Sequence, residues 1–286
     1  MAGIGDLLAP RARPRLMGVV NVTPDSFSDG GRWLEPGAAI AHGRDLIADG
    51  AEILDIGGES TRPGATRPLV EEELGRVIPV ITALAAEGAV VSVDTMRSEV
   101  AEAALAAGAA IVNDVSGGLA DPRILEVVAA TGAAYVGMHW RAHADHMRDF
   151  AVYDGPGGVV GAVCEELSAR VRAMRAAGIA REQIILDPGL GFAKRAEHNW
   201  ELLRSVDDLT ALGYPLLIGA SRKSFLGRLL AGSGGTPRPV DQREHANTAI
   251  TLHLARHGVW GVRVHDVRAS RDALSVAERL TEEDPE

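Results

Sequence analysis

Eight short apolar runs recur along the chain, and their spacing constrains its fold more than any other feature. The runs lie at residues 16–20, 52–56, 89–93, 110–112, 133–137, 183–186, 215–218 and 259–264. They are apolar almost without interruption, which is typical of strands covered on both faces, as in a parallel sheet. Each run therefore predicts one buried strand.

Helical patterns separate these runs. Apolar residues recur at helical spacing in segments that include 70–87, 98–107, 160–177, 245–257 and 270–280. Glycines stand where such helices would end: Gly50, Gly88, Gly108, Gly178, Gly213 and Gly258. Glycine is favoured there because it adopts the left-handed conformation that closes a helix.

Alternating strands and helices in a chain of 286 residues favour one α/β fold. A (β/α)8 barrel, also called a TIM barrel, needs about 250 residues and accommodates eight such units in one domain. We therefore predict a single barrel domain over residues 1–286, with residues 1–14 and 281–286 as flexible ends. An open, doubly wound sheet is the alternative, but no GxGxxG motif follows the first run to support it.

Composition excludes several classes of function. The formal charge of −10 argues against a nucleic-acid-binding surface, where Lys and Arg would dominate. Cys164 is the only cysteine, so neither an intrachain disulfide nor a cysteine-based zinc site can form. The first residues lack the apolar core of a signal peptide, and no apolar stretch is long enough to span a membrane. These features predict a cytoplasmic protein without membrane partners.

Polar residues follow the predicted strands one after another. The set comprises Asn21, Gly57 to Arg62, Asp94, Asn113 and Asp114, Met138 and His139, Asp187, Gly219 to Lys223, and Arg263 with His265. Because the strand ends of a barrel share one mouth, we expect these residues to converge on a single site. An Asp or Asn at such a position often only caps the next helix, and we interpret Asp55 and Asp114 as structural.

The residue types suggest the chemistry of that site. Asp94, Asn113 and Asp187 supply acceptors for a flat heterocycle with a donor-rich edge, such as a pterin or a guanine. Lys223, which can only donate, would complement a ring carbonyl or ring nitrogen. The basic side chains Arg62, Arg222, Lys223 and Arg263, together with His265, stand out in an otherwise acidic protein.

A phosphate group suits the remaining residues. Asn21, Arg263 and His265 could hold it, with Asn21 offering a hard oxygen to a Mg²⁺ that also binds the phosphate. Arg62 and Ser221 are then left for a second substrate. The helix expected after residues 221–224 would favour an anion through its free N–H groups.

At these positions the sequence resembles the dihydropteroate synthase family of pterin-binding enzymes. The matching segments are MGVVNVTPDSFSDGG (17–31), DIGGESTRPGA (55–65), SVDT (92–95), VNDVSGG (112–118), LDPGLGFAK (186–194), IGASRKSFLG (218–227) and VRVHDV (262–267). They span nearly the whole chain in order, and their residues are most similar to those of actinobacterial members.

The resemblance implies a condensation in folate biosynthesis. In this family, 6-hydroxymethyl-7,8-dihydropterin diphosphate reacts with 4-aminobenzoate to give 7,8-dihydropteroate and pyrophosphate. It also implies Mg²⁺ as cofactor, sulfonamides as competitors of aminobenzoate, and a homodimer formed through the last helices. The expected mechanism is dissociative: the diphosphate leaves first, and the amine attacks the resulting methylene cation.

The resemblance further assigns roles to individual residues. The pterin site would comprise Asp94, Asn113, Met138, Asp187, Phe192, Gly219 and Lys223, and the diphosphate site Asn21, Arg263 and His265, with Asn21 as the metal ligand. The aminobenzoate site would comprise Thr61, Arg62, Pro63, Phe192, Ser221 and Lys223, beneath a loop lid that carries Phe27, Ser28 and Asp29. Lys223, Arg263, His265 and Asp94 would act in catalysis.

Other functions remain open at this point. A methyltetrahydrofolate-binding methyltransferase domain and a non-catalytic pterin-binding paralogue share the Asp and Asn pattern. A Schiff-base aldolase could use Lys223. A zinc hydrolase built on His139, His143 and His146 would need rigid elements, whereas these residues fall in the irregular segment 141–159 or at its edge, so we expect them to face solvent.

Overall fold

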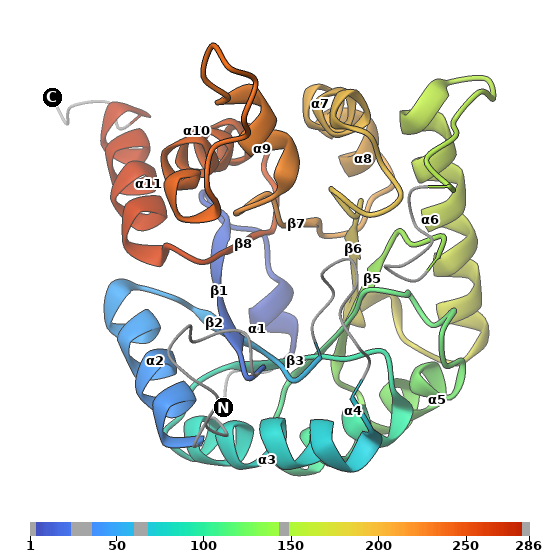
Figure 1. Ribbon diagram of the computed structural model, residues 1–286. Coiled ribbons are helices and arrows are strands. Elements are labelled where there is room, and N and C mark those ends of the chain that lie inside the picture. Colours follow the sequence, from blue (N-terminus) through green and yellow to red (C-terminus); the bar gives the residue numbers. More distant parts are fainter. Residues whose placement is uncertain (1–3, 24–35, 60–67, 143–148, 282–286) are drawn as a thin grey trace, which may run out of the picture.

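A single sheet of eight parallel strands forms the centre of the molecule, seen in Figure 1. The structure, a computed structural model, describes residues 4–23, 36–59, 68–142 and 149–281. The strands are β1 (Arg15–Asn21), β2 (Ile53–Gly57), β3 (Val91–Asp94), β4 (Ile111–Asp114), β5 (Ala134–Met138), β6 (Ile184–Asp187), β7 (Leu217–Ile218) and β8 (Gly261–Val264). Each overlaps one predicted run.

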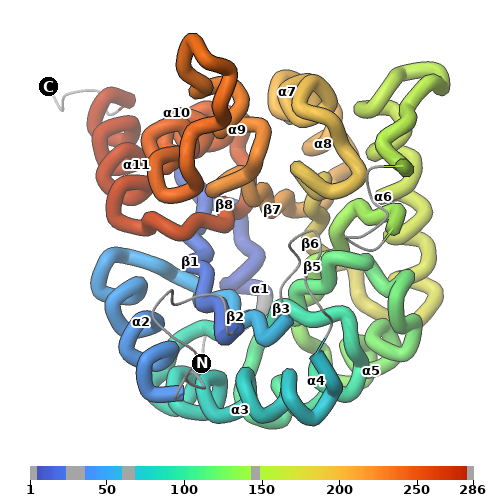
Figure 2. Tube along the Cα trace, in the orientation of Figure 1, coloured from blue at the N-terminus to red at the C-terminus, as the bar shows by residue number. Residues whose placement is uncertain are grey.

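The sheet closes on itself. The strand order is β6-β5-β4-β3-β2-β1-β8-β7, so β6 and β7 are its two ends. Leu186 of β6 donates its N–H to the Pro215 carbonyl at 2.9 Å and forms a parallel bridge with Leu216. These contacts join the two ends and complete the predicted (β/α)8 barrel. The first and last strands, β1 and β8, are hydrogen-bonded neighbours. Figure 2 shows them side by side.

Helices surround the strands in the predicted alternation. They are α1 (Ile4–Leu8), α2 (Pro36–Asp49), α3 (Val70–Ala86), α4 (Ser98–Ala106), α5 (Arg123–Thr131), α6 (Gly158–Ala176), α7 (Ala196–Arg204), α8 (Val206–Thr210), α9 (Ser224–Leu229), α10 (Glu244–Arg256) and α11 (Val267–Thr281). All six glycines predicted to end helices have positive φ, from 64° at Gly258 to 109° at Gly108. Within the described residues, no helix combines the length and apolarity that a membrane span requires.

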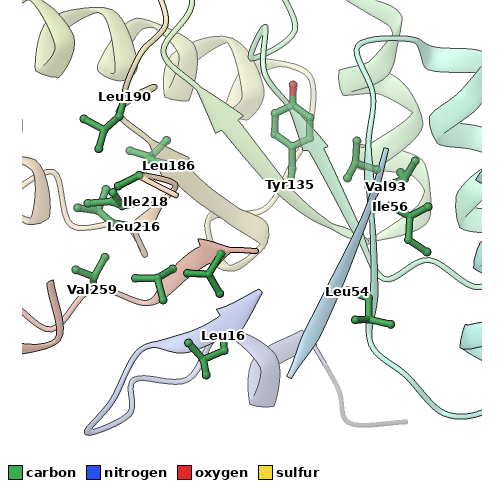
Figure 3. Close-up of a cluster of buried hydrophobic side chains, with 14 of the residues drawn as sticks. Leu16, Leu54, Ile56, Val93, Tyr135, Leu186, Leu190, Leu216, Ile218 and Val259 are labelled. Carbon is green, nitrogen blue, oxygen red and sulfur yellow. The ribbon is translucent and has the colours of Figure 1, made fainter. Parts of the chain in front are cut away.

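Alternation along each strand produces two apolar layers. The larger layer packs the outer faces of the strands against the helices, and Figure 3 shows part of it, including Leu16, Leu54, Ile56 and Val93. A second cluster fills the barrel and includes Met17, Ile53, Ile111, Val136, Ile185 and Leu217. Because side chains alternate along a strand, residues two positions beyond this second cluster face the same interior. Asp55, Asn113, Met138, Asp187 and Gly219 occupy those positions.

Helix α1 packs at the opposite end of the barrel, in the terminal segment for which we predicted flexibility. The Trp260 indole donates a hydrogen bond to the Leu7 carbonyl at 3.1 Å. Arg15 donates to the carbonyls of Asp6 and Ala9 at 3.1 and 3.0 Å. With that end covered, the strand ends that carry the polar residues form the accessible mouth.

Candidate active site

Most of the predicted site residues that the structure describes gather around one cavity. Ten of them line it: Asp94, Asn113, Met138, Asp187, Phe192, Gly219, Ser221, Lys223, Arg263 and His265. Val115 and Leu190 complete the lining. The contributing segments follow strands β3 to β8, so the barrel brings together side chains separated by up to 171 positions in the sequence.

Arg263 lies at the centre of a buried ion-pair network. Its Nε donates to Asp55 Oδ2 at 2.6 Å, and its Nη2 donates to Asp94 Oδ2 at 2.9 Å. Asn113 Nδ2 donates to the same Asp55 oxygen at 3.0 Å. From its place within a strand we interpreted Asp55 as structural, whereas it binds the guanidinium that lines the cavity. Period-two alternation from the interior residue Ile53 was the signal that places Asp55 inside the barrel.

Asp114, by contrast, has the structural role that we predicted. It is fully buried, and its carboxylate accepts hydrogen bonds from the Ser116 N–H and hydroxyl, the Gly118 N–H and the Tyr135 hydroxyl, each at 2.7 Å. These bonds shape the turn after β4. Asp114 is not among the residues that line the cavity.

Two acceptors in the cavity are oriented by fixed hydrogen bonds. A carboxylate only accepts, so Asn113 must present its amino group to Asp55, and its Oδ1 is the remaining acceptor. Asp187 accepts the Gly189 N–H at Oδ1 over 2.7 Å, which fixes the carboxylate and leaves Oδ2 as its second acceptor. Asn113 and Asp187 together therefore suit a ligand edge rich in N–H groups.

Burial shifts the ionisation of the acids in the cavity. It raises the pKa of Asp94 to about 7, where the Arg263 charge opposes the shift and the neighbouring Asp55 reinforces it. Burial likewise raises the pKa of Asp187 to about 6, with the Gly189 hydrogen bond and the Lys223 charge acting in the opposite direction. Both carboxylates therefore titrate near neutrality, as functional groups commonly do.

The cations respond to the same surroundings. Burial lowers the pKa of Lys223 to about 8, and nearby Arg263 lowers it further, while Asp187 and Asp94 oppose the shift. For Arg263, burial acts to lower the pKa, but the charges of Asp55 and Asp94 outweigh it and hold the pKa above its ordinary value. The cavity thus contains a permanent guanidinium cation beside a readily titrated amine.

Lys223 is held against an aromatic ring. Its Nζ lies 4.3 Å from the centre of the Phe192 ring, within the range of a cation–π contact. The lysine stem passes over Gly191, where φ is 81° and an added Cβ would lie only 3.1 Å from Lys223 Cδ. Only glycine can combine this positive φ with such a close approach of the lysine stem without strain.

Ser221 joins the ends of β7 and β8. Its Oγ lies 2.8 Å from His265 Nδ1, and the His265 N–H donates to that oxygen at 3.3 Å. Ser221 Oγ also reaches Glu244 Oε2 at 3.2 Å. Arg222, predicted to belong to the basic group, instead pairs with Glu244 at 2.7 Å and does not line the cavity.

The remaining predicted residues have other placements. Asn21 ends β1 beside Gly57, is partly exposed, and is not among the residues that line the cavity. Six residues that the resemblance assigned to the site lie outside the described residues: Phe27, Ser28, Asp29, Thr61, Arg62 and Pro63.

The expectation that the histidines after β5 face solvent is wrong for His139. Only 1% of its surface is exposed, and it lies between Glu166 and Lys194. His143 and His146 are outside the described residues. Among the residues that the structure does describe, no group of three or more His, Cys, Asp or Glu side chains could hold a metal ion.

Comparisons with known proteins agree with this geometry. Residues 17–265 match the family described as pterin binding enzyme. Dihydropteroate synthase of Mycobacterium leprae is 54% identical over 92% of each chain. The structure of Xanthomonas albilineans dihydropteroate synthase with 4-aminobenzoic acid superimposes with a TM-score of 0.86, at 45% identity and covering 95% of this chain and 94% of that one. The same enzyme in complex with 7,8-dihydropteroate gives a TM-score of 0.82, at 41% identity and 95% coverage of both chains.

Proposed function

The chain belongs to the pterin-binding enzyme family and, within it, to the dihydropteroate synthases, and from this premise we propose how its cavity performs their reaction. That reaction condenses 6-hydroxymethyl-7,8-dihydropterin diphosphate with 4-aminobenzoate, giving 7,8-dihydropteroate and pyrophosphate. The convergence of Asp187, Lys223 and Arg263 on one cavity is the observation that carries the proposal. These groups can bind a donor-rich ring and an attached anion together.

The pterin would bind deepest, between the oriented acceptors. Asp187 Oδ2 and Asn113 Oδ1 would accept hydrogen bonds from the amino and ring N–H groups. Lys223 would donate to the ring carbonyl or a ring nitrogen. Met138 and Phe192 would cover the faces of the ring, and Gly219 would leave room for it because it has no side chain. Asp94 contributes a further acceptor at the ring edge and keeps Arg263 in place.

The diphosphate would meet Arg263 and His265 at the mouth. Arg263 has five N–H donors, of which those directed at Asp55 and Asp94 occupy two, so others remain for phosphate oxygens. Positive charge in this position stabilises negative charge as it grows on the departing diphosphate. The carbon that is left positively charged is flanked by the electron-rich ring, which Asp187 and Asn113 hold. No strong general base is required, since the alkylated amine loses its proton readily.

The described residues are compatible with Mg²⁺ as the cofactor, provided that the substrate supplies most of its ligands. Asn21 offers an amide oxygen, a hard donor that suits Mg²⁺, at the partly exposed end of β1. Bound in that way, Mg²⁺ would neutralise charge on the leaving group.

The amine would approach from the side of Lys223 and Phe192. Ser221 lies within the same cavity, and we assign it, together with Thr61, Arg62 and Pro63, to aminobenzoate. We likewise assign Phe27, Ser28 and Asp29 to the segment that covers the bound substrates. Holding both reactants in one cavity raises the rate by positioning, without a covalent intermediate on the protein.

A coupled assay tests the function. Purified protein supplied with the pterin diphosphate, 4-aminobenzoate and Mg²⁺ should release pyrophosphate in proportion to the dihydropteroate formed. Omission of 4-aminobenzoate is the matched control and should prevent formation of dihydropteroate. Tight pterin binding with no product under the complete conditions would contradict the proposal and favour a non-catalytic paralogue. Methyl transfer from methyltetrahydrofolate would favour the methyltransferase alternative.

We also propose a cytoplasmic homodimer. The last helices α10 and α11 pack together, and α11 exposes Val276 and Leu280, which are 60% and 81% accessible. Light scattering of the purified protein should give twice the chain mass of 30.0 kDa, whereas a mass of one chain would contradict the dimer.

A further inference from the structure

The segment between β6 and α7, residues 188–195, holds Phe192 in the cavity through contacts to its own backbone. Lys194 Nζ donates to the Phe192 carbonyl at 3.1 Å. The Tyr153 hydroxyl donates to the Ala193 carbonyl at 3.0 Å, and the Gly191 N–H donates to Asn199 Oδ1 at 2.6 Å. The backbone on both sides of the Phe192 ring is therefore anchored by side chains.

This segment has a conformation that needs such anchors. Ala193 has a φ of 47°, in the left-handed region that residues with a Cβ rarely adopt. Gly189 has a φ of 68°, and a Cβ there would lie 2.4 Å from the His139 carbonyl oxygen. At Ala193 such a backbone is strained and persists only where its surroundings enforce it.

Lys194 connects the segment to a partly buried series of hydrogen bonds. Its Nζ lies 2.9 Å from His139 Nδ1, and His139 Nε2 lies 2.9 Å from Glu166 Oε2 on α6. Arg141 binds the same carboxylate, and its Nε donates to Glu166 Oε2 at 3.0 Å. These hydrogen bonds connect the Phe192 carbonyl, through the side chains of Lys194 and His139, to Glu166 on α6 at the outside of the barrel.

The ionisation states determine which group donates and which accepts in this series of hydrogen bonds. Burial lowers the pKa of His139 to about 4, and the nearby Lys194 lowers it further, so the imidazole is neutral. Burial acts to raise the pKa of Glu166, but hydrogen bonds from His139 and Arg141 bring it down to about 2. An ionised carboxylate only accepts, so Nε2 carries the imidazole proton and Nδ1 must accept from Lys194.

Lys194 also lies in the field of the pterin site. Burial lowers its pKa to about 7, and the charge of Asp187 opposes that shift. Conversely, Lys194 is one of the cations that lower the pKa of Asp187. The side chain thus adjoins the site without being among the residues that line its cavity.

We infer that Lys194 is a positioning residue: held by His139 and Glu166, it fixes the segment that presents Phe192 to Lys223, and so shapes the boundary between the pterin and aminobenzoate subsites. This inference rests on the proposed function, because those two substrates define the subsites. Lys194 touches neither the reacting atoms nor a phosphate in this account. Its removal should therefore affect the fit of aminobenzoate more than the chemical step.

Four substitutions test the inference. Lys194→Met removes the ammonium and keeps the length of the side chain, and Arg195→Met removes a neighbouring exposed cation as the matched control. His139→Asn keeps an acceptor near the position of Nδ1, so it can still accept from Lys194. His139→Gln instead keeps a donor near the position of Nε2, so it can reach Glu166 but not Lys194.

Steady-state kinetics and hydrogen exchange provide the readouts. Lys194→Met and His139→Gln should raise the KM for 4-aminobenzoate about tenfold, the effect of one lost charge-assisted hydrogen bond, with kcat little changed. Amide exchange in residues 188–193 should accelerate in the same two variants. Arg195→Met and His139→Asn should stay close to the wild type in both measurements. Thermal melts establish that each variant is folded. If Lys194→Met does not fold, His139→Asn and His139→Gln test the inference by the same measurements of KM and amide exchange.

The outcomes separate this inference from the proposed function. A wild-type protein that forms no dihydropteroate refutes the function, and the exchange measurement then still judges whether Lys194 anchors the segment. An unchanged KM and unchanged exchange in Lys194→Met overturn the inference in an enzyme that is otherwise active. Equal defects in His139→Asn and His139→Gln also overturn it, because they contradict the direction of this series of hydrogen bonds.

Discussion

Arg263 Nε on β8 lies 2.6 Å from Asp55 Oδ2 on β2, and this ion pair spans the intervening strand β1. Asp55 is fully buried, and Asp94 binds the same guanidinium from β3. One cation therefore compensates two carboxylates. These two ion pairs fix the orientation of the Arg263 guanidinium. They also determine how much stability the protein would lose if Arg263 were removed.

Arg263→Met should destabilise the protein by about 3–5 kcal/mol, because it leaves buried carboxylates without their partner. Without the cation, the pKa of Asp94 rises further above its unfolded value, and stability is lost as the pH rises through the folded pKa. The loss should therefore be greater at pH 8 than at pH 5, as measured by urea unfolding. Arg222→Met, which removes the more exposed pair with Glu244, should cost about 1 kcal/mol or less. Equal losses in the two variants would contradict the central role of Arg263.

Asp55→Asn and Asp114→Asn should separate a site residue from a structural one. Asp114→Asn replaces an acceptor of several hydrogen bonds and should destabilise the fold by about 1–3 kcal/mol, with the activity of the folded fraction retained. Asp55→Asn weakens the hydrogen bonds that Asp55 accepts from Arg263 and Asn113. Activity should therefore fall sharply even in folded protein. Activity per folded molecule, normalised by circular dichroism, distinguishes them. A lower activity in Asp114→Asn than in Asp55→Asn would contradict these roles.

Pterin binding should depend on pH through Asp187. Burial raises the pKa of this acid to about 6, and binding requires the ionised form, so affinity should fall as the pH drops through that value. Each further pH unit below it should cost about tenfold, because the ionised fraction falls tenfold. Calorimetric titration with 6-hydroxymethylpterin, which lacks the diphosphate, measures this directly between pH 5 and pH 8.

Asp187→Asn serves as the control for that titration. The substitution exchanges an acceptor for a donor and should weaken pterin binding about 10- to 100-fold at pH 8. It should also remove the part of the pH dependence that is centred near 6, leaving only the contribution of Asp94 near pH 7. An Asn variant that binds pterin normally, or keeps the same pH profile, would remove Asp187 from the pterin site.

Removal of Mg²⁺ should affect the diphosphate but not the ring. Chelation with EDTA should abolish turnover and weaken binding of the pterin diphosphate, whereas affinity for 6-hydroxymethylpterin should remain unchanged. Asn21→Ala should raise the Mg²⁺ concentration needed for half-maximal activity, because the amide oxygen is the protein ligand assigned to the ion. Full activity in EDTA would eliminate the cofactor from this mechanism.

The strands and helix ends were predictable because local chemistry determines them. Runs rich in Val, Ile and Leu fit a sheet covered on both faces, and glycines such as Gly88 and Gly108 are needed where φ is positive. The predicted run 215–218 is longer than β7: Pro215 has no N–H to donate, and only Leu217–Ile218 form the strand. The bridge at Leu216 still closes the barrel.

The site was predictable where a residue ends a strand, and less so elsewhere. Asp187, Asn113 and Arg263 carry that positional signal, whereas Asp55 lies within a strand, and only alternation from Ile53 reveals that it faces inward. His139 was misplaced because its partners are remote: Glu166 follows 27 positions later on α6, and Lys194 follows 55 positions later. Sequence spacing contains no information about such contacts until the fold brings the elements together.

A structure of the protein with 7,8-dihydropteroate bound would test the central claim most directly, since the product spans both subsites. We predict that its pterin edge lies against Asp187 and Asn113, with Lys223 on the ring and the aminobenzoyl group emerging past Phe192 and Ser221. Product bound away from Asp187 and Lys223, or with its pterin ring at the mouth and its benzoyl group inside, would contradict the account.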